Sequence, residues 1–152
     1  MWKKIKPYVI SIAVALLVGA AGSIFVKGSM EEYNALTKPA AVPPSWVFGV
    51  VWSILFILMG IGSAIIYLKG GGGKALTVYA VQLAMNFVWN ILFFSMQSYL
   101  AAFIWLMLLW IVVAYMIYLF YGISRAAAWM QVPYLLWLTF AGYLNYMIYV
   151  LN

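Results

Sequence analysis

The chain has 152 residues, of which 69% are hydrophobic and only 7% are charged, and its mean hydropathy is +1.09. Soluble domains carry about 25% charged residues, so this composition excludes a water-soluble globular protein. The sequence contains no Cys and no His. Their absence removes disulfides, thiolate chemistry, the usual zinc and haem ligands and His-based triads, so we predict no metal site and no cofactor.

Five apolar stretches are long enough to cross the roughly 30 Å hydrocarbon core of a bilayer as helices, and none contains a charged residue. The stretches do not alternate between apolar and polar residues, as the strands of a membrane β-barrel would. We predict an all-α membrane protein made of a single domain, residues 1–152. Its transmembrane helices are expected at about 7–26, 46–68, 75–96, 99–121 and 126–151.

The first stretch, 7–26, has two interpretations. Its Lys-rich start, apolar run and small residues from Gly19 to Ser23 resemble a secretory signal peptide. The apolar region of a signal peptide is usually about 7 to 15 residues long, whereas this one is longer, which favours a retained transmembrane helix. The mass of the mature protein distinguishes the two interpretations.

The connection at 27–45 is the longest in the chain and contains both acidic residues and three prolines: Glu31, Glu32, Pro39, Pro43 and Pro44. Loops of this length in a compact protein usually cover a functional site, so we predict a lid over a ligand. The connection at 69–74 ends in Gly-Lys, as a phosphate-binding loop does. Because Ala75 stands where such a loop has Ser or Thr, we interpret it as a flexible turn.

The stretch 75–96 carries polar residues at membrane depth, where function usually resides. At about 100° per residue, Gln82, Asn86 and Asn90 share one face with Trp89 and Phe93. These amides either bind a ligand or only join neighbouring helices by hydrogen bonds.

On the back of the same helix, Ala80 and Ala84 form a strip of small residues. Small residues let two helices approach closely, so this strip predicts a homodimer interface. The alternative is that the two alanines pack within the bundle of one chain.

Two further helices have aromatic faces. One face of 46–68 carries Gly49, Trp52, Phe56, Met59 and Ser63, and one face of 126–151 carries Tyr134, Trp137, Ala141, Leu144 and Ile148, with Asn145 at its edge. Each face places a small residue beside a Trp, which would admit a flat ligand, although such faces are more often ordinary packing. Pro133 predicts a mild kink early in the last helix.

The basic residues lie at the ends of the helices, not in one cluster, which argues against a nucleic-acid partner. With the N-terminus in the cytoplasm, Lys3, Lys4, Lys6, Lys69, Lys74 and Arg125 lie inside, and Lys27 and Lys38 lie outside. Because cytoplasmic loops carry an excess of Lys and Arg, we predict a multi-pass protein of the cell membrane with its N-terminus inside and its C-terminus outside.

The motifs together resemble the TspO/translocator-protein family, the tryptophan-rich sensory proteins. The resemblance rests on the residues from Tyr33 to Pro39, on Pro43-Pro44-Ser45-Trp46 to Trp52, on Gln82 to Phe94, and on Pro133 to Asn145. It covers essentially the whole chain. Two positions depart from the usual family pattern, because Glu32 and Ala41 stand where relatives often have Trp.

The resemblance implies a five-helix bundle, often a homodimer, that binds porphyrins and benzodiazepine-site ligands beneath the first loop. The implied ligand-binding residues are Tyr33, Trp52, Phe56, Asn86, Asn90, Phe93, Trp137, Ala141 and Asn145. We expect Trp52 and Trp137 to face one another and to sandwich a planar ligand, because indoles combine a flat apolar face with one N–H donor. The Lys or Arg of the C-terminal sterol motif is missing, so sterol binding is not expected.

A receptor for planar amphipathic ligands is therefore the leading function. Trp52 and Trp137 are also the candidates for any catalytic role, which would be at most a slow, light-dependent breakdown of bound porphyrin. A transporter is the alternative; ion-coupled transporters usually carry intramembrane charges or broken helices, and we find neither in the sequence. A structural or assembly subunit is the third possibility.

Overall fold

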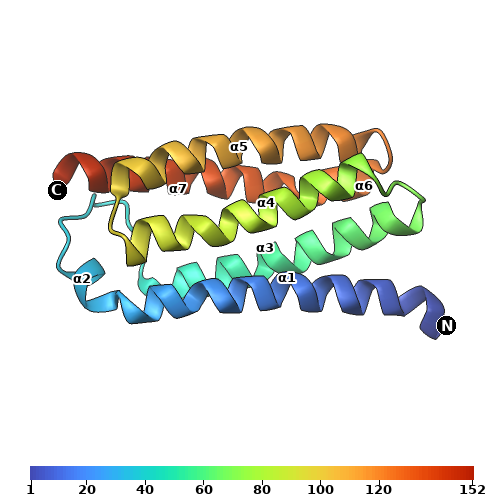
Figure 1. Ribbon diagram of the computed structural model, residues 1–152, viewed down its shortest axis with the longest axis horizontal. Coiled ribbons are helices and arrows are strands. Elements are labelled where there is room, and N and C mark those ends of the chain that lie inside the picture. The colour runs from blue at the N-terminus through green and yellow to red at the C-terminus, as the bar shows by residue number, and fades with distance from the viewer.

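The computed structural model describes all residues, 1–152, and contains only helices. The elements in chain order are α1 (Trp2–Gly28), α2 (Met30–Asn34), α3 (Ser45–Leu68), α4 (Lys74–Asn90), the π-helix η1 (Ile91–Ser95), α5 (Tyr99–Tyr121), α6 (Arg125–Met130) and α7 (Val132–Leu151). The long helices lie side by side along one axis, with the two chain ends at opposite ends of the bundle (Figure 1).

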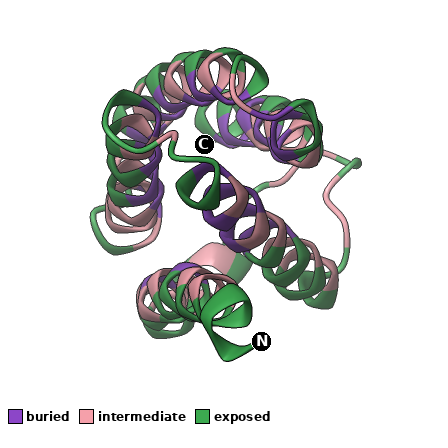
Figure 2. Ribbon diagram, turned by 90° about the vertical axis from the view of Figure 1, so that its right-hand side faces the viewer, coloured by how far each residue is buried: buried purple, intermediate pink, exposed green.

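Five spans are long and apolar enough to cross a membrane: Trp2–Gly28, Ser45–Leu68, Lys74–Ser95, Tyr99–Tyr121 and Arg125–Leu151. Helices satisfy their own backbone hydrogen-bonding groups, which is what the bilayer interior demands. Many large apolar residues are exposed, as expected when lipid replaces water as the solvent. Figure 2 shows exposed residues along the outer sides of the helices. The predicted all-α, five-helix membrane fold is confirmed.

The helices pack in a definite order around the bundle. Helix α1 lies against α3 and α4, α5 lies against α4 and α7, and α3 closes the bundle against α6. The backbones of α3 and α7 do not pack closely, and large aromatic side chains fill the space between these two helices. This space is where the candidate site forms.

Helix α1 is fitted closely to its neighbours by glycines. A Cβ added to Gly60 of α3 would lie 2.5 Å from the Cα of Ile12, and one added to Gly22 of α1 would lie 2.6 Å from Nδ2 of Asn90. Such close approach is typical of membrane helix pairs, in which small residues allow van der Waals packing. Helix α1 thus packs closely on α3 and α4.

The fifth span is interrupted at one residue. Gln131 separates α6 from α7 but keeps helical dihedral angles, with φ −91° and ψ −9°, and Pro133 occupies the first turn of α7. Proline has no N–H and its ring clashes with the preceding turn, so the helical hydrogen bonding is interrupted there. The interruption is the local disturbance that Pro133 predicted, and Arg125–Leu151 remains one span long and apolar enough to cross a membrane.

The connection after α1 is not an open loop. It contains the short helix α2 and continues to α3, and it is tied to the end of α7. The backbone N–H of Thr37 donates to Oδ1 of Asn152 at 3.0 Å, and Nδ2 of Asn152 donates to the carbonyl of Thr37 at 2.8 Å. The segment from α2 to Thr37, here called the lid, thus lies across the end of the bundle where the C-terminus is found (Figure 1).

Candidate functional site

A small cavity, here called the inner pocket, lies within the bundle and has an empty volume of about 200 Å³. Its lining comes from α3, α4, α5 and α7 and consists of Trp52, Asn86, Trp89, Leu106, Leu109, Leu138 and Ala141. Three of these, Trp52, Asn86 and Ala141, were predicted site residues. The lining is neutral, so the pocket can stack and hydrogen-bond a ligand but offers no general acid or base.

Trp52 is the centre of an aromatic cluster. Its ring lies 5.7 Å from that of Phe56, 6.1 Å from that of Tyr134 and 6.4 Å from that of Trp137, measured between centroids. The planes of Trp52 and Trp137 are perpendicular, at 90°. The two indoles therefore touch edge to face, a preferred aromatic geometry, and do not stand parallel across a gap as expected.

The nitrogen of Trp137 is unusual among the indoles of the site. Its Nε1 is buried and has no hydrogen-bond partner. The indoles of Trp89, Trp105 and Trp110, in contrast, donate to Asn145, to the carbonyl of Met85 and to Thr139. A buried donor without a partner costs roughly 1–3 kcal/mol, so such a group is a natural place for an acceptor atom of a ligand.

The amides predicted on α4 form a chain of hydrogen bonds beside the pocket. Asn86 donates from Nδ2 to the Tyr134 hydroxyl at 2.9 Å, and that hydroxyl donates to Oε1 of Gln82 at 2.7 Å. Asn90 donates from Nδ2 to the carbonyl of Asn86 at 3.3 Å. These bonds link α4 to α7 and fix the orientation of Asn86 at the pocket wall.

Asn145 does not line the inner pocket but holds Trp89, which does. Its Oδ1 accepts from Nε1 of Trp89 at 3.1 Å, and its Nδ2 donates to the carbonyl of Tyr99 at 2.9 Å. Asn145 is buried and does not line the inner pocket, so it positions Trp89. Trp89 in turn is stacked on Phe93, with centroids 5.1 Å apart and planes at 25°.

Two predicted site residues lie elsewhere. Tyr33 and Phe93 line a shallow depression under the lid, here called the lid pocket, which has no room for a water molecule. Burial raises the pKa of the Tyr33 phenol above its ordinary value. The structure thus does not gather the predicted residues in one pocket. Four of them line neither pocket: Phe56, Asn90, Trp137 and Asn145.

The predicted dimer strip lies on the outside of the bundle. Ala80 and Ala84 are exposed, as is Val81 between them. They do not pack within the chain, so the alternative weighed for these alanines is removed.

The sequence did not single out three leucines of the inner pocket, Leu106, Leu109 and Leu138. Helix α5 is apolar on every side, so no periodic pattern distinguishes the residues that face inward. Trp89 was placed on the correct face of its helix but not among the ligand-binding residues. Its position beside Asn86 and Asn90 on that face was the available signal.

Comparison with known proteins gives a consistent result. Residues 11–151 match the TspO/MBR family. The chain is 40% identical to the tryptophan-rich protein TspO of Chlorobaculum tepidum, over 100% of this chain and 99% of that protein. It is 38% identical to the tryptophan-rich protein TspO of Archaeoglobus fulgidus, over 95% of each chain. It is also 38% identical to the human translocator protein, over 84% of this chain and 79% of that protein.

Proposed function

The chain belongs to the TspO/MBR family, and from this premise we propose that it is an integral membrane receptor for planar amphipathic ligands. The ligand class is tetrapyrroles such as protoporphyrin IX, together with benzodiazepine-site ligands. The binding place is the inner pocket, between α3, α4, α5 and α7.

One observation carries this proposal: the buried Nε1 of Trp137 has no partner and belongs to the aromatic cluster that adjoins the inner pocket. A planar ligand that stacks on indole faces and offers a carbonyl or carboxylate to this N–H satisfies both features at once. Asn86, held by Tyr134, adds a second polar group at the wall. The small side chain of Ala141 leaves room for the ligand plane.

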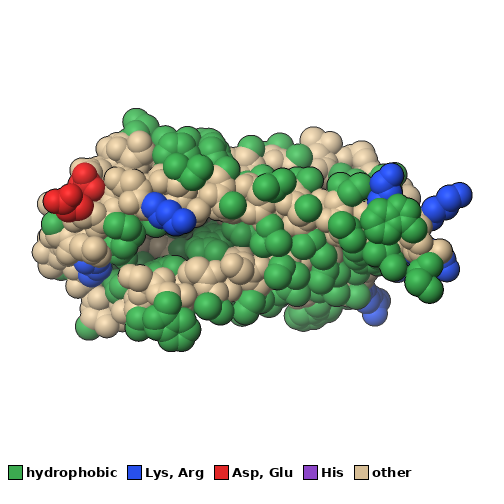
Figure 3. All heavy atoms as spheres, turned by 90° about the horizontal axis from the view of Figure 1, so that it is seen from below, with side chains coloured by type: hydrophobic (Ala, Val, Ile, Leu, Met, Phe, Trp, Pro, Cys, Tyr) green, Lys and Arg blue, Asp and Glu red, His purple; other side chains and the backbone are tan.

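The size of the inner pocket implies that binding requires movement. The enclosed space is only about 10 Å³, room for about one water molecule, whereas sites of drug-sized ligands usually measure roughly 300–1,000 Å³. Trp52 and Trp137 must therefore separate from their edge-to-face contact as the ligand enters. A hollow with a hydrophobic floor between α1 and α3, at the end of the bundle near the acidic residues (Figure 3), supports access from the lipid side.

The test is a titration of the full-length protein in nanodiscs with protoporphyrin IX, in which intrinsic Trp fluorescence is measured. Saturable quenching is expected, because Trp52, Trp89 and Trp137 lie at the site. Quenching that rises linearly with ligand, and is the same for a control nanodisc protein with exposed Trp residues, would contradict the proposal.

The same proposal extends to photochemical loss of bound porphyrin. The reaction would be a light-driven oxidation by dioxygen of the macrocycle, in which Trp52 and Trp137 exchange electrons with it. Equal bleaching by the wild type and by the Trp52→Phe/Trp137→Phe double variant, at matched occupancy, would show that the indoles act only as walls.

Transport is the second candidate function. The break at Gln131 favours it, since discontinuous helices are common in transporters, and Oε1 of Gln131 is buried without a partner. The names of the human and bovine relatives, translocator proteins, point the same way. The break lies near one end of its span and not at the bilayer midplane, so the receptor function is preferred. Uptake of labelled porphyrin into proteoliposomes that collapses with an ionophore would reverse this preference.

The proposed orientation places the end with Lys3, Lys4, Lys6, Lys69, Lys74 and Arg125 in the cytoplasm and the lid outside. A reporter fused after Asn152 should then be active only outside the cytoplasm, and cytoplasmic activity would contradict the orientation. The proposed assembly is a homodimer in which the exposed strip of Ala80 and Ala84 allows two α4 helices to approach closely.

A further inference from the structure

We propose that the C-terminal end of α5 binds an anionic phospholipid. The headgroup lies on a row of tyrosines, Tyr115, Tyr118 and Tyr121, here called the tyrosine ridge, and the side chains of Lys74 and Arg125 hold it. One acyl chain lies along the exposed face of the same helix. This inference goes beyond the proposed receptor function and requires nothing of the inner pocket.

The tyrosine ridge lies on the outside of the bundle. Its members follow one another at a spacing of three residues, which places them on one ridge of a helix surface. All three are exposed, and Tyr118, in the middle, is 73% exposed. The rings of Tyr115 and Tyr118 are stacked, with centroids 6.4 Å apart and planes at 19°. Tyrosine is enriched where a membrane meets water, and its O–H can donate to a headgroup oxygen.

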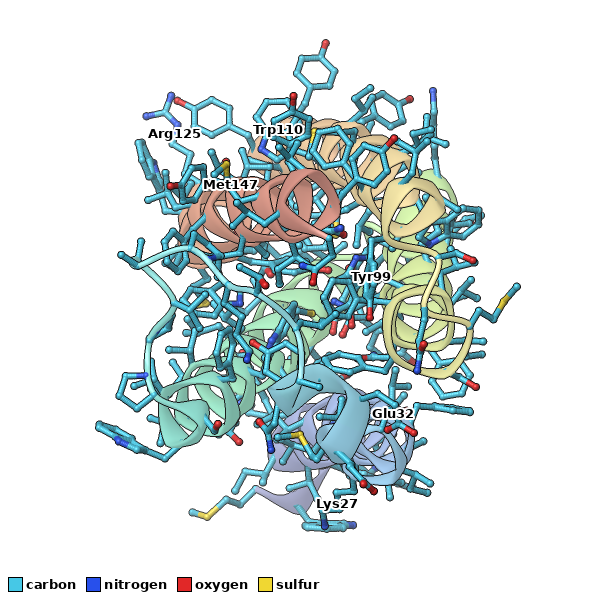
Figure 4. The ribbon with its side chains drawn as sticks, turned by 90° about the vertical axis from the view of Figure 1, so that its left-hand side faces the viewer. Lys27, Glu32, Tyr99, Trp110, Arg125 and Met147 are labelled. Carbon is cyan, nitrogen blue, oxygen red and sulfur yellow. The ribbon has the colours of Figure 1, made fainter.

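A cation flanks each end of the ridge. Nζ of Lys74, the first residue of α4, lies 5.5 Å from the centroid of the Tyr115 ring. The guanidinium carbon of Arg125, the first residue of α6, lies 5.4 Å from the centroid of the Tyr121 ring. Such contacts hold a charge in place and leave N–H donors for an acceptor. Figure 4 shows Arg125 at the outer edge of the bundle, pointing away from it. A phosphate group suits these donors, and Arg can bind it with two parallel bonds.

The charge of this end of the bundle selects an anion. Both acidic residues of the chain, Glu31 and Glu32, belong to α2 at the opposite end, so neither Lys74 nor Arg125 has an acidic partner (Figure 3). Four further basic residues lie at the same end as the ridge: Lys3, Lys4, Lys6 and Lys69. In the proposed orientation this end meets the cytoplasmic leaflet, where anionic lipids are found.

The exposed face of α5 identifies the anion as a lipid. Ile104, Leu108, Ile111 and Tyr118 are 48–73% exposed, and at 100° per residue they lie within an arc of about 80°. From Tyr118 back to Leu108 the helix rises about 15 Å, which is half of the roughly 30 Å hydrocarbon core. An acyl chain of one leaflet therefore lies along this face while its headgroup reaches the ridge. A soluble anion would leave this apolar face unused.

The test compares two lipids with the same acyl chains, dioleoylphosphatidylglycerol and dioleoylphosphatidylcholine, which differ in net charge. Binding to the full-length protein in a maltoside detergent is measured by native mass spectrometry. The wild type should bind the anionic lipid about twentyfold more tightly, because each of the two cations contributes about fivefold. Equal affinity for the two lipids would overturn the proposal.

Two double variants separate the ridge from the general charge of this end. Lys74→Gln/Arg125→Gln should lose the preference for phosphatidylglycerol and bind phosphatidylcholine as the wild type does. Lys3→Gln/Lys4→Gln removes the same charge at the same end, from α1 and without a contact to an aromatic ring, and should keep most of the preference. All four positions are exposed, so thermal unfolding should be unchanged. If both variants lose the preference equally, the attraction is nonspecific and the site is wrong.

The same spectra test the other occupants of this face. A change from dimer to monomer in Lys74→Gln/Arg125→Gln would make the face a contact between two copies of the chain and contradict a lipid site. Displacement of phosphatidylglycerol by sn-glycerol 3-phosphate would identify a soluble anion and contradict it as well. Lys74→Gln/Arg125→Gln should bind protoporphyrin IX normally, since neither residue lines the inner pocket. Failure of the receptor proposal therefore leaves the lipid measurement unaffected.

Discussion

The indole of Trp137 lies edge-on to the indole of Trp52, with ring centroids 6.4 Å apart and planes at 90°. This contact joins α3 to α7 where their backbones do not pack closely. It fills space that a planar ligand needs, and it leaves Nε1 of Trp137 buried and unpaired. Trp52 lines the inner pocket and Trp137 packs on Trp52 outside that lining, so we expect both indoles to move when a ligand enters.

The first prediction concerns the unpaired N–H. Trp137→Phe keeps an aromatic ring and removes the donor, so tetrapyrrole binding should weaken by about 0.5–1.5 kcal/mol, or roughly two- to tenfold. Thermal stability should stay the same or rise. The smaller ring loses some packing, but removing the unpaired buried donor offsets that loss. Titration and thermal unfolding of the same preparation check both effects. A large fall in stability would mean that the N–H has a partner in the folded protein.

The second prediction concerns space at the pocket wall. Ala141→Leu places three further carbons in the inner pocket, which has only about 200 Å³. Binding should weaken more than it does in Trp137→Phe, because the added side chain occupies the ligand plane. Tyr143→Leu, on the exposed surface of the same helix, is the control and should bind normally. Normal binding by Ala141→Leu would place the ligand elsewhere.

The third prediction concerns the homodimer. Replacing both Ala80 and Ala84 by Leu should shift the detergent-solubilised protein toward monomer, because the bulkier side chains keep two α4 helices apart. Light scattering after size-exclusion chromatography measures the mass. The matched control is Ala101→Leu/Ala126→Leu, two exposed alanines outside α4. If the Ala80→Leu/Ala84→Leu variant keeps the dimer mass, as the control should, the proposed interface is wrong.

The fourth prediction concerns the tie between the lid and α7. Asn152→Ala removes both hydrogen bonds to Thr37, each worth about 0.5–1.5 kcal/mol. Hydrogen exchange at the Thr37 amide should become faster, and stopped-flow quenching should show faster ligand association and dissociation. Asn34→Ala, an exposed position on α2, serves as the control. Unchanged rates in Asn152→Ala would mean that the lid does not limit access.

The five spans were predictable because bilayer thickness fixes the length of an apolar helix, and the polar face of α4 was predictable because helical periodicity fixes which residues share a face. Gln82 and Asn86 are buried together, as that periodicity requires, and both bond to Tyr134. Side-chain rotation is not encoded in periodicity. The perpendicular arrangement of Trp52 and Trp137 therefore could not be predicted.

Irregular backbone was the other feature that could not be predicted from the sequence. Pro133 signalled a disturbance but not its size, since a proline near a helix start is compatible with either a kink or a new helix. The π-helix η1 and the strained Gln97 depend on how α4 meets α5, which no local pattern reveals. These irregular segments bring Phe93 and Phe94 together under the lid, an arrangement that became visible only in three dimensions.

The most direct test of the account is the NMR signal of the Trp137 indole N–H in protein labelled with ¹⁵N-tryptophan, assigned by its loss in Trp137→Phe. On addition of protoporphyrin IX, the Trp137 and Trp52 signals should shift strongly, whereas those of Trp2 and Trp129, which are 62% and 66% exposed, should stay in place. Saturating ligand that leaves the Trp137 and Trp52 signals unchanged would contradict the inner pocket as the binding site.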